Sequence, residues 1–300
     1  MPVIAGPTAS GKSHAALALA REYGLEIVSA DAMQVYRGMD IGTAKPSRAE
    51  RNEVPHHLLD IVTPAERFSV ADYVRLAEET IDEVLARDGR PVVVGGTGFY
   101  LKALGEGLPQ LPPADETAQA PLWDLVAAGK LDELIEELRA ASPQDAERAG
   151  VNPRRVVRAV EVLRRSGRPP SSFPLTTPRF TYRTLLLLPA AAELKERVAA
   201  RATTMFEAGL VTEVETLLQQ YPQQPTALQA IGYKEVAAHL RGECSLADAV
   251  DEVTRATQRY AKRQRTWFKA VRNATFLEST GEAALDAARA WWGEASARGG

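Results

Sequence analysis

The stretch GPTASGKS, residues 6–13, decides how this sequence is expected to fold. It fits the pattern of glycine, four residues, glycine, lysine and serine, in which backbone N–H groups turn inward around phosphate oxygens. The apolar residues VIA precede it and an apolar-periodic segment follows it, as a strand and a helix would. The helix N-terminus adds positive potential that favours bound phosphate. The pattern predicts a phosphate-binding loop formed by Gly6, Pro7, Thr8, Ala9, Ser10, Gly11, Lys12 and Ser13.

Strand and helix patterns alternate after this loop. EIVSAD (residues 26–31) and RPVVVGG (residues 90–96) have the composition of buried strands, and residues 68–89 between them have helical spacing with Ser69 as N-cap. Helices that alternate with continuous apolar strands imply a parallel sheet covered on both faces. The sequence therefore predicts an α/β fold, a P-loop parallel sheet core flanked by helices.

Two proline-rich segments interrupt this alternation. PQLPPADE (residues 109–116) and SGRPPSSFPLTTPRF (residues 166–180) enclose a region in which only helical patterns occur, and TYRTLLLL (residues 181–188) then restores a core strand. We expect a P-loop catalytic core with C-terminal helices at residues 1–108 plus 181–300, and an inserted all-helical domain at residues 109–180.

Composition narrows the class of protein. The chain has 300 residues, a formal net charge of −3 and one cysteine, Cys244, which cannot form an internal disulfide. Its apolar runs are far shorter than the roughly 20 residues of a membrane span. The chain enters the phosphate-loop motif at once, without room for a secretion signal, so we expect a cytoplasmic location. We expect a monomer that needs neither a membrane nor a protein partner.

The strand ends suggest where chemistry takes place. Open parallel sheets bind ligands at the C-terminal edge of their strands, so Gly6, Asp31 and Gly95 should line one crevice. An ATP hydrolase normally places a carboxylate at the end of a second strand to hold Mg²⁺, but here residues 91–94 lead into GGTGFY. Asp31 suits a general base, and equally a helix-capping or Mg²⁺-bound carboxylate.

Two runs of basic residues offset the acidic total. One follows Asn152 and includes Arg154, Arg155 and Arg158 with only Glu161 against them, and the other extends from Arg255 without an intervening acidic residue. Such runs are often ordinary solvated helix faces, but two of them without nearby counter-charges favour contact with RNA phosphates.

Read together, seven motifs resemble the tRNA dimethylallyltransferase family, also called isopentenyl-tRNA transferases, in its bacterial form. They are GPTASGKS, SADAMQVYRGMDIGTAKP, PHHLLDIV, VVVGGTGFYLKAL, NPRRVVRAVEVLRRSG, LQAIGYKE and TRATQRYAKRQRTWF. The resemblance implies transfer of a dimethylallyl group from dimethylallyl diphosphate to N6 of the adenosine 3′-adjacent to the anticodon in tRNA, with release of diphosphate. The loop then holds the donor's diphosphate, and no carboxylate is needed to activate water.

The resemblance also implies residue roles. Asp31 matches the catalytic base, Thr97 a threonine near the leaving diphosphate, and Arg201 an arginine that contacts the diphosphate. Mg²⁺ is the implied cofactor, with Ser13 as its protein ligand. The residues implied in binding the anticodon arm of tRNA are Asp31, Ala32, Met33, Gln34, Arg154, Arg155, Arg158, Gln229, Ala230, Ile231, Gly232, Tyr233 and Lys234.

Some features fit other interpretations. A P-loop small-molecule kinase that binds ATP would explain the loop but leaves the basic runs unused, and a non-catalytic RNA-binding module would leave Lys12 and Asp31 unused. His56 and His57 are expected to be structural, because adjacent residues face apart on a strand or helix. Gln119 stands where the family often has arginine, so no catalytic role is assigned there.

Overall fold

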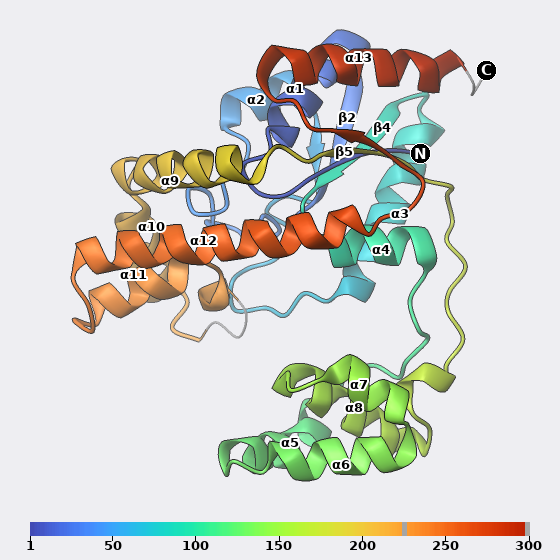
Figure 1. The fold of residues 1–300 in the computed structure, drawn as a ribbon, viewed down its shortest axis with the longest axis vertical. Coiled ribbons are helices and arrows are strands. Elements are labelled where there is room, and N and C mark those ends of the chain that lie inside the picture. Colours follow the sequence, from blue (N-terminus) through green and yellow to red (C-terminus); the bar gives the residue numbers. More distant parts are fainter. Residues whose placement is uncertain (224–226, 298–300) are drawn as a thin grey trace. The chain divides into compact units, whose positions relative to one another are not determined.

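The computed structural model describes residues 1–223 and 227–297, with side chains described to residue 293 (Figure 1). The chain divides into two compact units. The first, which we call the core unit, is formed by Met1–Gly105 and Arg179–Gly300, and the second, the helical unit, by Glu106–Pro178. No helix in the described residues is long and apolar enough to cross a membrane.

The core unit contains a sheet of six strands in the order β3-β2-β4-β1-β5-β6, and every neighbouring pair in it is parallel. The α/β fold class is therefore confirmed. The strands are β1 (Pro2–Ala5), β2 (Leu25–Ala30), β3 (His56–His57), β4 (Arg90–Gly95), β5 (Arg183–Leu187) and β6 (Ala274–Leu277).

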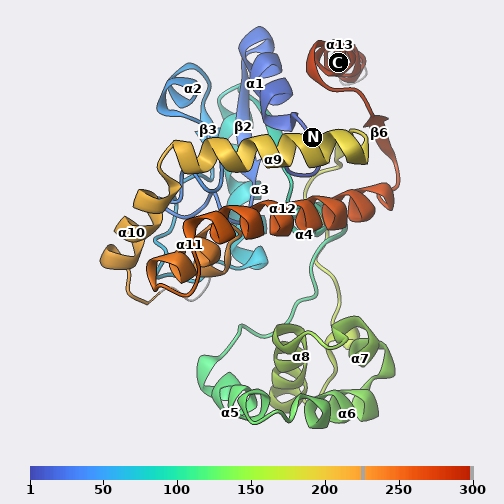
Figure 2. The ribbon, with the colours of Figure 1, turned by 60° about the vertical axis from the view of Figure 1, so that its left-hand side comes forward.

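Helices flank this sheet (Figures 1 and 2). They include α1 (Lys12–Tyr23), α2 (Arg48–Glu53), α3 (Val70–Ala86), α4 (Gly98–Glu106), α9 (Ala191–Glu207), α10 (Leu210–Gln220), α11 (Tyr233–Leu240), α12 (Leu246–Lys269) and α13 (Gly281–Ala297), with a 3₁₀ turn, η2 (Ala227–Gln229). Ser69 caps α3 through the Asp72 N–H as predicted, because its side chain supplies an acceptor that the first turn lacks.

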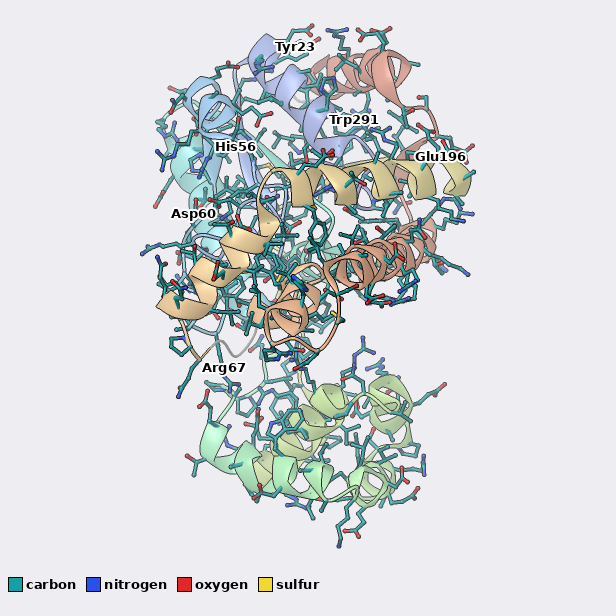
Figure 3. The ribbon with its side chains drawn as sticks, turned by 90° about the vertical axis from the view of Figure 1, so that its left-hand side faces the viewer. Tyr23, His56, Asp60, Arg67, Glu196 and Trp291 are labelled. Atoms are coloured by element: carbon teal, nitrogen blue, oxygen red, sulfur yellow. The ribbon has the colours of Figure 1, made fainter. Side chains whose placement is uncertain are left out.

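Alternation along the strands gives each face of the sheet its own apolar cluster. Ile4, Val92 and Val94 face a cluster that contains residues of α1 and Trp291 of α13. Figure 3 labels Trp291 and, at the end of α1, Tyr23. Val3 and Val93 face the other cluster, which contains residues of α3 and α4 and reaches Phe268 in α12. Both faces are covered, so these strands can be apolar on both sides.

A third apolar cluster lies beside the sheet and supports the chain that follows β2. Val35, Tyr36 and Met39 pack there against residues of α10 and α11. The position of the segment after Asp31 is therefore set by helices that are far away in the sequence.

The helical unit has its own core. Leu122, Leu134, Leu138 and Val156 are buried together in it. Its elements are α5 (Glu116–Ala127), α6 (Leu131–Ala141), α7 (Pro143–Ala149), α8 (Pro153–Ser166) and η1 (Pro170–Ser172). Asn152 caps α8 by accepting the Arg155 N–H, as its position before Pro153 predicts.

Candidate active site

Three strands of the core unit end at the same level of the sheet. Ala5 pairs with Gly95, and Gly95 pairs with Ala30. Gly95 and the residues that follow the other two strands, Gly6 and Asp31, therefore lie at one edge of the sheet, as predicted.

The phosphate-binding loop leads from β1 into α1 in a tight conformation. Gly11 precedes α1 with a left-handed φ of 91°, and the Ser10 N–H donates to the Pro7 carbonyl at 3.2 Å. A Cβ on Gly6 would lie 2.4 Å from the Leu187 carbonyl oxygen, so only glycine allows this close approach to β5. The loop thus ends at the N-terminus of α1, where backbone N–H groups are available to an anion.

Gln264 in α12 connects this loop to the end of β4. Its buried amide accepts the Thr8 N–H at 2.9 Å and donates to the Gly96 carbonyl at 2.8 Å. The amide therefore ties the loop to the end of β4. The sequence alone does not identify Gln264 as a functional residue, although it lies in the AKRQRTWF motif.

Two cations stand at the loop. Burial lowers the pKa of the Lys12 ammonium from 10.5 to about 8, with Asp31 raising it and Arg201 lowering it. Arg201, from α9, lies within 3.3 Å of the Thr8 hydroxyl, and burial lowers its pKa while Asp31 opposes this. The charges of Lys12, Arg201 and Asp31 are therefore close enough to act on one another, although the three residues are far apart in the sequence.

Asp31 follows β2 directly and has one oxygen occupied. Its Oδ1 accepts the Met33 N–H at 2.9 Å and the Gln34 N–H at 3.4 Å. This is the capping role left open by the sequence. Within the described residues Oδ2 has no hydrogen-bond partner, so the same carboxylate can also accept a proton. Burial and the Asp31 charge also raise the pKa of the Tyr260 hydroxyl to about 12.

Thr97 holds the Asp31 segment in place. Its hydroxyl oxygen accepts the Ala32 N–H at 3.0 Å, and its own N–H donates to the Ala30 carbonyl at 3.2 Å. Because the oxygen serves as acceptor, its own O–H is available as a donor.

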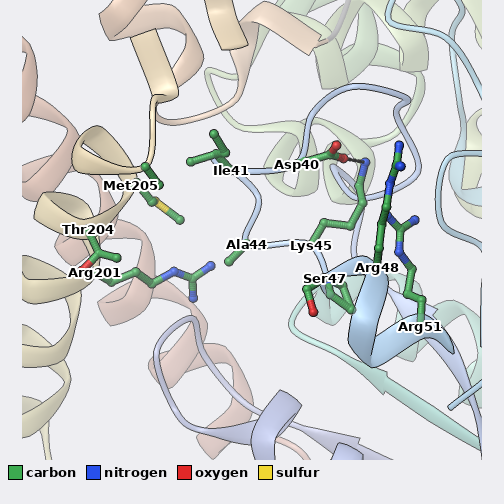
Figure 4. Close-up of a pocket in the computed structure, with 12 residues that line it drawn as sticks. Asp40, Ile41, Ala44, Lys45, Ser47, Arg48, Arg51, Arg201, Thr204 and Met205 are labelled. Carbon is green, nitrogen blue, oxygen red and sulfur yellow. Dashed lines mark hydrogen bonds and ion pairs between the residues drawn. The ribbon is translucent and has the colours of Figure 1, made fainter. Parts of the chain in front are cut away.

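A cavity of about 390 Å³ lies next to Arg201, and Figure 4 shows the side chains that line it. The Arg201 side chain extends from α9 toward Ala44, across the cavity. Lys45 contributes little net charge there, because its buried ammonium contacts Asp40 and Asp60, each at 2.6 Å. Residues that line the cavity include Asp40, Ile41, Arg48, Arg51, Thr204 and Met205.

The residues implied in tRNA contact differ in their accessibility. The Gln34 amide donates to the carbonyls of Thr43 at 3.2 Å and Ala44 at 3.3 Å, so its donors are occupied by protein. Tyr233 is 1% exposed and Ala230 is 9% exposed, whereas Lys234 is exposed. Gln229 is also exposed, Ile231 is half-buried and Gly232 is buried. Tyr233 is therefore a buried residue that packs beneath this segment.

The basic helix α8 is not free of counter-charges, contrary to our expectation. Buried Glu161 pairs with Arg158 at 2.7 Å and with Arg165 at 2.9 Å. Gln119 donates to the same carboxylate at 2.7 Å, which gives it a structural role. Arg154 and Arg155 remain exposed. Glu161 lies three residues after Arg158 on the same side of the helix and therefore offsets its charge. Contact of Arg158 with tRNA stays a prediction.

The second basic run, which begins at Arg255, also has an acidic partner that we did not expect. Glu252 lies one turn before it in α12 and pairs with Arg255 at 3.1 Å and with Arg259 at 2.5 Å. Counting charges only from Arg255 onward missed this partner.

The two adjacent histidines form β3 at an edge of the sheet and have structural partners. The His57 ring contacts Glu26 at 2.7 Å, and the ring of His56, which Figure 3 labels, contacts the Val54 carbonyl at 2.7 Å. Among the described residues, no group of three or more His, Cys, Asp or Glu side chains is placed to hold a metal ion.

Comparisons with known proteins match nearly all of the chain. A family model described as IPP transferase matches residues 34–271, and one described as isopentenyl transferase matches residues 1–63. A tRNA dimethylallyltransferase of Thermus thermophilus is 53% identical over 292 residues, which cover 97% of each chain. One of Deinococcus radiodurans is 48% identical over 273 residues, or 90% of this chain and 89% of the relative.

Solved structures agree with these matches. The crystal structure of the full-length tRNA isopentenylpyrophosphate transferase from Bacillus halodurans has a TM-score of 0.70 and 35% identity, and covers 97% of this chain and 95% of that chain. A eukaryotic dimethylallyltransferase acting on tRNA has a TM-score of 0.78 and 26% identity, over 98% of this chain and 77% of that chain.

Proposed function

The chain belongs to the IPP transferase family. We propose that its phosphate-binding loop holds the diphosphate of dimethylallyl diphosphate. It transfers a prenyl group to tRNA. The finer proposal is that the acceptor is N6 of the adenosine 3′-adjacent to the anticodon. We also propose a cytoplasmic location, which a tRNA acceptor favours, and a monomeric state.

The observation that carries this proposal is the position of Asp31 at the same edge of the sheet as the loop. One carboxylate oxygen is fixed by the Met33 N–H, and the charge of Asp31 acts on both Lys12 and Arg201. A single carboxylate that faces a phosphate cradle suits a base that works against a phosphorylated donor. At the end of β4, by contrast, Gly95 and Gly96 offer no carboxylate that could orient water.

At the allylic carbon the reaction forms one bond and breaks one, and a proton moves from N6 to the protein. N6 attacks the allylic carbon, the bond from that carbon to oxygen breaks, and its electron pair leaves on the diphosphate. The loop N–H groups, Lys12 and Arg201 stabilise the negative charge that develops there. The proton lost from N6 goes to Asp31 Oδ2, and the Thr97 O–H is available to the leaving diphosphate.

Mg²⁺ is part of the proposal through Ser13. Ser13 is exposed in the first turn of α1, next to the loop. Mg²⁺ usually keeps several waters and takes substrate phosphates with few protein ligands, so the lack of an acidic cluster in the described residues fits it. When bound, the ion would neutralise diphosphate charge.

The tRNA must present its base out of the stack, because N6 is otherwise not accessible to the donor. We propose that the segments 31–34 and 229–234 of the core unit receive the anticodon loop. Exposed Arg154 and Arg155 of the helical unit would bind backbone phosphates, which position the RNA without reading its sequence.

One assay tests the proposal against a kinase and a binding module. The protein is incubated with unmodified tRNA and Mg²⁺, together with either dimethylallyl diphosphate or ATP, and the digested nucleosides are analysed by mass spectrometry. We expect prenylated adenosine with the diphosphate donor alone. Transfer of phosphate from ATP to a small molecule would support the kinase instead, and tRNA binding without product would support the module.

A further inference from the structure

Glu213 in α10 accepts hydrogen bonds from three successive backbone N–H groups and from the Tyr233 hydroxyl. Its Oε2 accepts the Asp40 N–H at 3.0 Å and the Ile41 N–H at 2.7 Å. Its Oε1 accepts the Gly42 N–H at 3.2 Å and the Tyr233 hydroxyl at 2.6 Å. Three successive N–H groups that converge on one anion form a strong and directional site.

The loop that Glu213 holds also contacts the segment after β2. Beyond Gly42 the chain continues into Thr43 and Ala44, whose carbonyls accept both bonds from the Gln34 amide. Gln34 is in turn fixed by the Ser29 hydroxyl, which donates to its Oε1 at 3.2 Å. Any shift of residues 40–44 therefore changes the contacts of Gln34 in the segment 31–34.

Tyr233 connects the same carboxylate to the segment 229–234. A Cβ on Gly42 would lie 2.4 Å from the Tyr233 ring, so the loop and the start of α11 are in direct contact. The Tyr233 hydroxyl is buried, and burial together with Glu213 raises its pKa well above the usual range. It therefore remains a donor to Glu213 at any physiological pH.

The loop is held from its other side by Lys45. The Lys45 ammonium donates to the Tyr36 carbonyl at 2.8 Å and to Asp40 at 2.6 Å. On the opposite side, Glu213 accepts the N–H groups of residues 40–42, while Ile41 packs against the apolar cluster of α10 and α11.

We propose that Glu213 is a positioning residue that joins two separate acceptor-binding segments, 31–34 and 229–234, into one surface. This inference rests on the proposed function, in which both segments receive tRNA. Glu213 contacts neither substrate. It acts on the acceptor side through residues 40–44 and Tyr233, because its hydrogen bonds go to this loop and to Tyr233 rather than to the donor cradle at Lys12 and Arg201.

The test compares Glu213→Ala and Glu213→Gln with the control Glu215→Ala. Glu215 is an exposed glutamate on the same helix, so its replacement removes the same charge without breaking the contacts of Glu213. Loss of charge-assisted bonds predicts a rise of about tenfold or more in KM for tRNA for Glu213→Ala, with KM for dimethylallyl diphosphate within about twofold of the parent. Glu213→Gln keeps one acceptor oxygen and should show a smaller rise. Glu215→Ala should match the parent protein.

A double variant makes the test specific. Tyr233→Phe should raise KM for tRNA less than Glu213→Ala, and adding it to Glu213→Ala should cause no further rise, because both remove the same contact. A lower melting temperature with an unchanged KM for tRNA would overturn the inference, since Glu213 would then only stabilise the fold. Equal rises in KM for both substrates would also overturn it. Failure of the parent protein itself to prenylate tRNA would instead refute the proposed function.

Discussion

At the scale of single residues, Lys12 shows how burial adjusts a charge to its ligand. An ammonium with an ordinary pKa is charged throughout the neutral range, but burial brings that of Lys12 to about 8. A bound diphosphate would favour the charged form and raise this pKa again. Donor binding is therefore linked to the proton on Lys12.

This linkage predicts the pH dependence of donor affinity. Below pH 8 the free protein already carries the charge on Lys12. Above pH 8 donor binding must be accompanied by uptake of a proton on Lys12, so the affinity for the donor falls as pH rises through about 8. The fall approaches roughly tenfold per pH unit at its steepest. Calorimetric titration with dimethylallyl diphosphate measures it. Lys12→Arg keeps its charge and should give a flat profile, whereas a flat profile in the parent protein would contradict the linkage.

Asp31 combines two roles that a suitable substitution can separate. Asp31→Asn keeps Oδ1 as acceptor for the Met33 N–H but removes the base, so turnover should fall by about 10²-fold or more with tRNA Kd within about twofold. Asp31→Ala also removes the acceptor and should weaken tRNA binding in addition. Single-turnover rates and a filter-binding assay measure both. If Asp31→Asn lost binding as much as turnover, the assignment of the base would be wrong.

At the scale of elements, α12 joins the phosphate-binding loop to β4 through Gln264. Gln264→Leu leaves the Thr8 N–H and the Gly96 carbonyl without their partner, which should lower the free energy of unfolding by about 1–3 kcal/mol. We also expect a higher KM for the donor, because the loop is no longer fixed. Gln258→Leu removes only an exposed bond from the same helix and serves as control. Equal effects of the two variants in urea titrations would contradict this role.

Helix α8 carries the prediction about tRNA phosphates. Replacing Arg154 and Arg155 with alanine should reduce the salt slope of tRNA binding by roughly one to two, and an unchanged slope would remove this helix from the interface. Arg158 has to remain in place, because its loss would leave buried Glu161 with fewer partners. We expect Arg158→Ala to act mainly on the melting temperature of the protein.

Elements of the core were largely predictable, whereas the contacts between them were not. Apolar runs and helix caps such as Ser69 predicted the strands and helices, because hydrophobic periodicity and capping are local properties of the sequence. The motif resemblance placed Asp31, Lys12 and Arg201 at one site. Gln264 and Glu213 could not be found in this way, because their roles depend on partners from other elements. The same reason explains the two-residue strand β3, which exists only through its pairing with β2.

At the scale of the whole molecule, each of the two units has an apolar core of its own. At the base of the helical unit, Thr176 and Leu108 exchange hydrogen bonds of 2.8 and 2.9 Å, so the two connecting segments run together there. This arrangement is typical of an insertion that closes on itself.

We expect the core unit to fold and bind the donor without the insertion. Replacing residues 106–178 with a short glycine-serine linker should leave the donor Kd within about twofold, and should weaken tRNA binding by at least about tenfold because phosphate contacts are lost. Loss of donor binding in a variant with a cooperative melting transition would contradict the independence of the units.

A crystal structure with a donor analogue whose allylic carbon–oxygen bond cannot break would show directly where the donor binds. We expect its diphosphate to lie within the loop of residues 6–13 and to contact Lys12 and Arg201, with the allylic carbon facing Asp31 Oδ2. A diphosphate bound elsewhere, or a loop that accepts only the phosphates of ATP, would contradict this expectation.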